Sequence, residues 1–410
     1  MPRRALALAA LTLAVGLLSV VPASAGAQTP ATPPALGTPL PSATSVPAFD
    51  GDAMWIWLMT RTEGGSAARI AARAKRSGLD LVILKAGNER TQWTQLNPTL
   101  VRTLHNAGIR VCGYHFVYGR YPVSEARLSA RIARTGADCL VIDAESEYQG
   151  RYVQAQLYMR ELRRLVGTSY PVGLTSFPYV HYHSSFPYSV FLGPDGADFN
   201  VPQMYWRAIG TSVDSIFQIT YMHNRIYDRP IYPLGQVWMH PRPAEIRRFR
   251  ALATAYGSTG VSWWSWQEGN TRDFSAVGAP LLRSLARPRD PGYPLLTALS
   301  RGDIVVRAQQ LLLSAGAKLR VTARMDLATR RAVAAFKRAR GLGSNGSVTP
   351  ATWPALLAFE PTPITWRARG YALPTPQLAS KASAVHSDVV TTAPPRWPAR
   401  ANELRNRPGG

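Results

Sequence analysis

Short apolar runs recur along the chain at a nearly constant interval. Eight runs begin at residues 54, 81, 111, 139, 171, 199, 230 and 260, which places successive starts 27 to 32 residues apart. Several intervals carry the apolar period of an amphipathic helix, such as SAARIAARAKRSG and PAEIRRFRALATAYG. Eight strand–helix units over roughly 215 residues predict an α/β fold, a (β/α)8 TIM barrel. An open doubly wound sheet has the same period, but the count of eight favours closure, and no GxGxxG follows any run.

The chain begins with a segment that is typical of secretory signals. Two arginines precede an apolar run that ends in Ala-Ser-Ala at 23–25, a small-residue cleavage pattern. We therefore expect a signal peptide over residues 1–27; an uncleaved anchor is the alternative. Residues 28–50 are rich in Pro, Ala and Thr and predict an extended linker, followed by the barrel over residues 51–286. No later run is long enough to cross a membrane.

Residues 295–359 have a different pattern. LSRGDIVVRAQQLLLSAG, DLATRRAVAAFKRARGL and TPATWPALLAF each have the apolar period of a helix. We therefore expect a second, small all-α domain of three helices. Residues 360–410 are polar and basic without such a period, and we expect a disordered tail.

The net charge of +23 raises the question of a nucleic-acid partner. Only five of the 47 basic residues are lysines, and no Lys/Arg block alternates with aromatic residues, so we expect no nucleic-acid binding. An exported basic protein is attracted at long range by the anionic polymers of an envelope. A general bias toward arginine would produce the same charge, and both explanations stay open.

The chain has two cysteines, Cys112 and Cys139, in successive predicted strands. A disulfide between them is one possibility. Because small apolar residues surround both, the pattern favours two buried thiols.

Three carboxylates follow the fourth apolar run at every second position, in VIDAESEY. In an extended strand Asp143, Glu145 and Glu147 would share one face. They would lie at the carboxyl end of the strand, where barrels of this kind carry their reactive groups. Neighbouring carboxylates raise the pKa of one another, and hydrolysis of a glycosidic bond needs one carboxyl that stays protonated near neutral pH.

Polar and aromatic side chains lie at the ends of the other predicted strands. Sugar rings stack on aromatic side chains and their hydroxyls take hydrogen bonds, so this set suits a sugar. The candidate substrate-binding residues are Tyr114, His115, Gln203, Tyr205, Trp238, Trp266 and Glu268. A structural hydrogen bond is the alternative for His115. Trp264 and Trp266 should share one side of the last strand, and core packing is the alternative for both.

We expect no metal and no cofactor. The candidate metal-ligating pair is His181 and His183 in YVHYH. No third ligand lies nearby in the sequence, so an ordinary surface loop is the better interpretation.

The small helical domain resembles the peptidoglycan-binding-like domain that is attached to wall-degrading enzymes. The matching positions are Leu299, Gly302, Asp303, Val306, Gln310, Leu313, Gly316, Thr329, Ala332, Val333, Phe336, Gly341, Leu342, Gly346, Val348, Thr352, Trp353 and Leu356. The chain departs from the family at Lys337, where the family usually has Gln, and in RVTARMD, which lacks the usual Asp-Gly turn. The resemblance implies peptidoglycan as the partner and a location at the cell wall.

The barrel resembles the TIM-barrel muramidases, the family 25 lysozymes. The similarity is strongest at residues 113–116 (GYHF) and 143–145 (DAE). It implies that Glu145 is the proton donor and Asp143 its neighbouring carboxylate, so both are candidate catalytic residues. The muramidases also have an Asp in strand one, which MWIWLM lacks.

A second resemblance is to the chitinases. Asp138, Asp143 and Glu145 match three of the four acids of their D-x-x-D-x-D-x-E strand. That family's mechanism uses the N-acetyl group of the substrate as the nucleophile. Glu147 and Glu268 are further candidates for a second carboxylate.

Together these features predict a secreted, monomeric, wall-associated glycoside hydrolase-like protein. It would bind peptidoglycan and cleave its N-acetylated glycan strand. One alternative is a non-catalytic peptidoglycan-binding protein with a degenerate barrel. Another is a structural envelope protein that uses the barrel as a spacer, which leaves the clustered acids unexplained.

Overall fold

The computed structural model describes residues 45–282, 284 and 288–367 of the 410-residue chain. The predicted signal peptide (1–27) lies outside these ranges, as do most of the predicted linker and most of the predicted tail.

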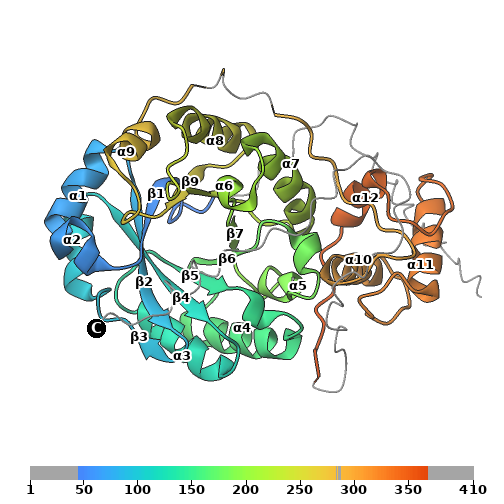
Figure 1. The fold of residues 1–410 in the computed structure, drawn as a ribbon. Coiled ribbons are helices and arrows are strands. Elements are labelled where there is room, and N and C mark those ends of the chain that lie inside the picture. The colour runs from blue at the N-terminus through green and yellow to red at the C-terminus, as the bar shows by residue number, and fades with distance from the viewer. Residues whose placement is uncertain (1–44, 283, 285–287, 368–410) are drawn as a thin grey trace, which may run out of the picture. The chain divides into compact units, whose positions relative to one another are not determined.

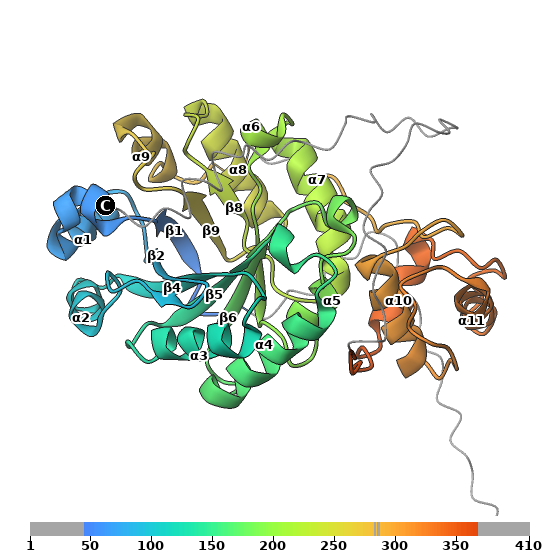
Figure 2. The ribbon, with the colours of Figure 1, turned by 60° about the horizontal axis from the view of Figure 1, so that its bottom comes forward.

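Eight parallel strands form a barrel, as the sequence predicts (Figure 1, Figure 2). They are β1 (Gly51–Ile56), β2 (Leu81–Asn88), β4 (Arg110–Val117), β5 (Cys139–Ala144), β6 (Val172–Ser176), β7 (Phe199–Pro202), β8 (Leu234–Gln236) and β9 (Gly260–Trp264). The order in the sheet is β7-β6-β5-β4-β2-β1-β9-β8, and the short β3 (Thr91–Gln92) pairs with β2. Parallel bridges from Asn200 to Ile231 and from Gln203 to Leu234 join its two edges. The barrel is therefore closed.

Helices surround the barrel (Figure 1). They are α1 (Ala67–Arg76), α2 (Pro98–Asn106), α3 (Pro122–Ala133), α4 (Tyr152–Val166), α5 (Tyr188–Phe191), α6 (Trp206–Ile209), α7 (Val213–Asn224), α8 (Pro243–Ala255) and α9 (Thr271–Val277). Side-chain caps define several starts. Asn97 accepts a hydrogen bond from the N–H of Leu100, and Asn270 accepts one from the N–H of Asp273, which satisfies amides that a helix leaves unpaired. Within the described residues, no helix has both the length and the apolar character to span a bilayer.

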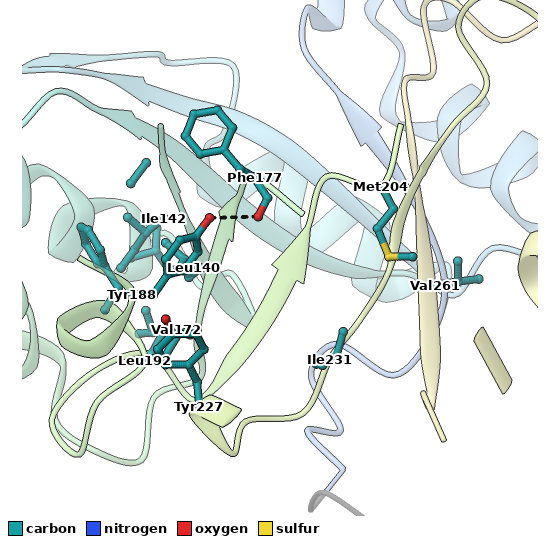
Figure 3. Packing of buried hydrophobic residues seen from close by; sticks show 14 of the residues in the cluster. Leu140, Ile142, Val172, Phe177, Tyr188, Leu192, Met204, Tyr227, Ile231 and Val261 are labelled. Carbon is teal, nitrogen blue, oxygen red and sulfur yellow. Dashed lines mark hydrogen bonds between the residues drawn. The ribbon is translucent and has the colours of Figure 1, made fainter. Parts of the chain in front are cut away.

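The hydrophobic core has two layers. One lies inside the barrel, and the other lies between the strands and the helices. Figure 3 shows part of the outer layer, where Leu140, Ile142 and Val172 lie near Tyr188, whose hydroxyl donates to the carbonyl of Phe177 at 3.0 Å. Both faces of each strand are buried, which is why the strands read as continuous apolar runs in the sequence.

Cys112 and Cys139 form a disulfide inside the barrel, so the expectation of two thiols is wrong. The two residues are direct partners in the parallel register of β4 and β5, with their Cα atoms 4.6 Å apart. Their apolar surroundings are those of the barrel interior. Apolar neighbours indicate burial and do not distinguish a thiol from a disulfide.

The C-terminal domain has the three expected helices, α10 (Asp303–Ser314), α11 (Leu327–Arg338) and α12 (Trp353–Leu357). It contacts the barrel through Asp303, which is fully buried. The carboxylate accepts hydrogen bonds from the hydroxyls of Tyr152, Ser189 and Tyr227 at 2.6 to 2.8 Å, and from the Ser189 N–H at 2.8 Å. Arg307, also buried, donates to a barrel carbonyl at 2.7 Å.

The residue before Asp303 must be glycine. Gly302 has a φ of 97°, and a Cβ there would collide with a barrel carbonyl, that of Ser184. The Gly-Asp pair of this motif therefore allows a close approach between the C-terminal domain and the barrel and supplies its central hydrogen-bond acceptor.

The first prediction concerns the disulfide. Denatured but unreduced protein should take up no thiol-alkylating reagent, and reduced protein should take up two equivalents, as read by intact mass. Because the bridge spans 27 residues, replacing both cysteines with alanine should lower the free energy of unfolding by about 3 kcal/mol. Alkylation before reduction would contradict the bridge.

The second prediction concerns Asp303. Burial raises the pKa of its carboxyl from 3.8 to about 6, against the opposing effect of its hydrogen bonds. A carboxyl whose pKa is raised on folding contributes its stability fully below the unfolded pKa, and this contribution is lost as the pH rises through the folded pKa.

The wild type should therefore lose stability relative to Asp303→Asn between about pH 4 and pH 7, by roughly 3 kcal/mol at most. Urea unfolding of both proteins across this range measures the difference. A difference that does not change with pH would contradict the assignment.

Candidate active site

Two carboxylates meet at the carboxyl end of β5. Asp143 and Glu145 are both buried, with 2% and 5% of their surface exposed. The side-chain amide of Gln203, at the end of β7, donates to both, at 3.4 Å to Asp143 Oδ1 and 2.9 Å to Glu145 Oε1. Because both oxygens contact one nitrogen, they lie no more than about 6 Å apart, a spacing suited to two carboxyl groups that act on one sugar.

Glu147 does not continue the face that Asp143 and Glu145 share. The strand ends at Ala144, and Glu147 lies in the 3-10 turn η3 (Ser146–Tyr148). The expectation of three carboxylates on one strand face is therefore wrong for the third. Partial burial, and then the charge of Glu145, raise the pKa of Glu147, so this carboxyl holds its proton more strongly than a free glutamate.

A buried lysine and several aromatic rings lie inside the barrel. Lys85 is fully buried, and its Nζ lies 5.3 to 5.5 Å from the ring centres of Trp93, Tyr114 and Phe116. The Tyr114 ring packs 4.9 Å from that of Trp55. Phe116 is the register partner of Asp143, so the lysine and the carboxylate belong to the same part of the barrel.

The ends of β7 and β8 carry a second aromatic group. The ring centres of Tyr205 and Trp238 are 6.2 Å apart and perpendicular. Gln236, fully buried, accepts from the N–H of Arg207 and donates to the carbonyl of Trp238, both at 2.9 Å. Its amide therefore ties the loop after β8 to the segment after β7.

Three indole nitrogens near the barrel interior have no acceptor among the described residues. They are Nε1 of Trp55, Trp57 and Trp238. All three rings belong to or pack against the inner cluster. A buried donor without an acceptor costs about 1–3 kcal/mol, so these N–H groups are suited to a ligand rich in acceptors.

The structure places His115 away from the two carboxylates. It is fully buried, with Nδ1 2.7 Å from the Ser129 hydroxyl on α3 and Nε2 2.8 Å from the Glu89 carbonyl. Burial lowers the pKa of His115 to about 3. Both ring nitrogens are thus occupied, which favours the structural role over substrate contact.

Trp266 and Glu268 follow the end of β9. Because the strand ends at Trp264, the expected alternation stops there. Trp264 lies in the inner cluster, whereas Trp266 packs on Phe274 in the outer layer and donates its N–H to Glu63 at 3.2 Å. The expectation that both tryptophans share one side is wrong. Glu268 is exposed on the following loop.

One hydrogen-bonded pair near the carboxyl ends of the strands could not be recognised from the sequence. His240, on the loop after β8, has Nδ1 2.8 Å from an oxygen of Asp273, which is fully buried on α9. Met239 and His240 both have positive φ, 61° and 42°, a conformation that costs energy in residues other than glycine. The residues are 33 apart in the sequence, and neither belongs to a recognisable motif.

The histidines of YVHYH are held by ring contacts. His183 stacks on Phe177 with centroids 3.4 Å apart, and His181 stacks on His223 at 4.1 Å. Burial lowers the pKa of His181 to about 3 and that of His183 to about 4. Across the described residues, no three His, Cys, Asp or Glu side chains gather in a way that could hold a metal ion.

Comparison with protein families matches residues 301–356 to the putative peptidoglycan binding domain. This span contains α10, α11 and α12. The resemblance that the sequence pattern indicated for the C-terminal domain is therefore confirmed. The comparison with curated proteins found no match.

Solved structures similar to the chain include several glycan-degrading enzymes. The endo-1,4-beta-mannanase of Rhizomucor miehei is 10% identical, over 56% of this chain and 92% of that one, with a TM-score of 0.44. The chitinase of Chromobacterium violaceum is 13% identical, over 58% and 99%, with a TM-score of 0.42. The catalytic domain of the endolysin ply40 from bacteriophage P40 of Listeria monocytogenes is 17% identical, over 39% and 76%, with a TM-score of 0.29.

The third prediction concerns Gln203. Gln203→Leu should lower the free energy of unfolding by about 2 kcal/mol, because two buried carboxylates lose a shared donor. In a Glu145→Gln background the same change should cost less, since a hydrogen bond to a neutral amide is weaker. A urea-unfolding cycle over the four proteins measures this coupling. Equal costs in both backgrounds would contradict the shared contact.

Proposed function

We propose that the barrel is a glycoside hydrolase that cleaves the N-acetylated glycan strand of peptidoglycan, while the C-terminal domain holds the protein on the wall. The observation that carries this proposal is the pair Asp143 and Glu145, buried together at the carboxyl end of β5 and bound by one amide. In a (β/α)8 barrel this end of the strands is where catalysis takes place. The match of residues 301–356 to a peptidoglycan-binding family supports the choice of substrate.

Glu145 is the proton donor in this proposal and Asp143 its neighbouring carboxylate. Glu145 gives its proton to the glycosidic oxygen as the bond to the anomeric carbon breaks. The acetamide oxygen of the same sugar forms a bond to that carbon, and Asp143 orients the acetamide. Water then attacks the anomeric carbon, the acetamide oxygen leaves, and a proton returns to Glu145. No separate enzyme nucleophile is required.

The surrounding side chains supply what a sugar needs. Tyr205 and Trp238 offer ring faces and edges, and the unpaired N–H groups of Trp55, Trp57 and Trp238 offer donors to sugar oxygens. The Tyr114 ring packs on that of Trp55, with the ring centres 4.9 Å apart. We assign these residues to substrate binding. Glu268, exposed and further along its loop, is assigned to the outer part of the site.

Export is part of the proposal. The sequence of residues 1–27 has the form of a signal peptide, and disulfides such as Cys112–Cys139 persist in oxidising compartments outside the cytosol. We therefore propose a secreted, wall-associated protein that acts as a monomer.

A non-catalytic, glycan-holding barrel is the second candidate. The observation that favours it is the end of β1, where Trp55 and Trp57 stand and the family 25 muramidases have an Asp. Without that carboxylate, a muramidase mechanism of that kind is incomplete. The substrate-assisted mechanism does not need it, which is why we prefer that route.

The fourth prediction tests the chemistry. Digestion of purified peptidoglycan by the wild type should release fragments with new sugar reducing ends, identified by mass. Glu145→Gln keeps the size of the side chain but cannot donate a proton as an acid, so the rate should fall by about 10² to 10⁴. Asp143→Asn should also slow cleavage.

Glu360→Gln is the matched control, because it removes one exposed carboxylate that follows α12, outside the barrel. It should keep most of the activity. Equal rates for wild type and Glu145→Gln would remove Glu145 from the mechanism. Failure of the wild type to release any fragment, while it still sediments with the wall, would select the non-catalytic candidate.

A further inference from the structure

Two arginines of the C-terminal domain lie directly opposite each other. Arg301 and Arg324 are partners in an antiparallel bridge, and both side chains are exposed. Directly opposite residues in such a pair have Cβ atoms about 5 Å apart, and like charges in this arrangement are destabilising. The pair therefore costs the domain stability unless an anion lies between the two guanidinium groups.

The domain provides no such anion. Its only acidic residues in the span 295–359 are Asp303 and Asp326. Asp303 is buried against the barrel, and the Asp326 carboxylate accepts from the Thr329 N–H at 2.8 Å and the Thr322 hydroxyl at 2.7 Å. No ion pair involves Arg301 or Arg324 among residues 45–282, 284 and 288–367.

The backbone that carries the two arginines is firmly held. Gln309, fully buried, accepts from the N–H groups of Thr322 and Ala323, both at 3.0 Å, and donates to the Arg324 carbonyl at 3.1 Å. These bonds hold Ala323 at a φ of 55°, a conformation that alanine rarely adopts. Gly302 N–H donates to the Ala323 carbonyl on the other side of the pair. The arginines are thus presented by a fixed platform, which lowers the cost of ordering them around a ligand.

Two large apolar side chains lie at one end of this platform. Leu299 is 90% exposed and Leu327 is 53% exposed. The antiparallel pairing, which also joins the Ser300 carbonyl to the Met325 N–H, brings the segments that carry both leucines to the same end. An anion with an apolar neighbour fits this surface better than a chain of phosphates, which is polar on all sides.

We propose that Arg301 and Arg324 together bind a free carboxylate of the peptide chains of peptidoglycan, with Leu299 and Leu327 contacting the apolar part of the peptide next to it. Two guanidinium groups about 5 Å apart at their bases reach the two oxygens of one carboxylate. The inference deepens the wall binding proposed above and rests on it.

The test is sedimentation of the full-length protein with purified peptidoglycan. The phosphate-containing polymers are first removed from the peptidoglycan, and the experiment is done on ice. Arg301→Gln/Arg324→Gln should bind at least about 10-fold more weakly than the wild type, because charge-assisted hydrogen bonds are lost. Its melting temperature should be equal or higher, since a repulsive pair is gone. The wild type should bind peptidoglycan whose carboxylates have been converted to amides more weakly, to a similar degree.

The matched control is Arg331→Gln/Arg338→Gln, which removes the same charge from exposed positions on α11. It should bind within about 3-fold of the wild type, as expected for a loss of long-range attraction alone. Equal weakening of both double variants would overturn the proposal in favour of general charge. Wild-type binding that disappears when the phosphate polymers are removed would assign the site to those polymers. A wild type that binds no wall preparation would overturn the proposed wall binding itself.

Discussion

Closure of the barrel between β7 and β8 is the constraint on which the rest of the structure depends. Parallel strands always place their carboxyl ends on one side of the sheet, but these ends form a ring around one site only when the two edges of the sheet meet. Here they meet through the bridges Asn200–Ile231 and Gln203–Leu234. Gln203 has a double role, since its backbone joins the edges while its side chain binds Asp143 and Glu145. The same residue therefore completes the fold and positions the two carboxylates.

The contact between the barrel and the C-terminal domain is a second constraint. A carboxylate surrounded by three hydroxyls and one amide is a specific arrangement, because a buried charge without these donors would be strongly unfavourable. Asp303 thus determines where the domain attaches. The attachment uses one side of α10, whereas Arg301 and Arg324 are exposed. The wall binding that we propose and the attachment to the barrel therefore use different residues of the same domain.

Much of the fold could be predicted from the sequence because strands that are buried on both faces appear in it as continuous apolar runs. Every strand of the barrel overlaps one of the eight apolar runs, and all three C-terminal helices follow their apolar period. The position of Asp143 and Glu145 could be predicted for the same reason, since Asp143 lies near the end of β5 and Glu145 directly follows the strand. The predicted positions of Glu147 and Trp266 were wrong because their strands end early, at Ala144 and at Trp264. The alternation of side chains along a strand does not show where the extended backbone stops.

Contacts between distant segments were predicted poorly. The Cys112–Cys139 bridge depends on the register of two parallel strands, and His240–Asp273 depends on two loops meeting. The contact of Asp303 with the barrel could not be predicted for a different reason. It belongs to a motif of the C-terminal domain, and the motif says nothing about which hydroxyls of the barrel will meet it. In each case the contact depends on how segments that are distant in the sequence meet in the folded chain.

The stereochemistry of the reaction tests the central claim most directly. Two carboxylates whose nearest oxygens are within about 6 Å of each other, acting with the acetamide of the substrate, should retain the configuration at the anomeric carbon. Proton NMR of a peptidoglycan digest at early times, before the anomers equilibrate, should therefore show the new reducing ends as β-anomers. New reducing ends that first appear as α-anomers would contradict the roles given to Asp143 and Glu145.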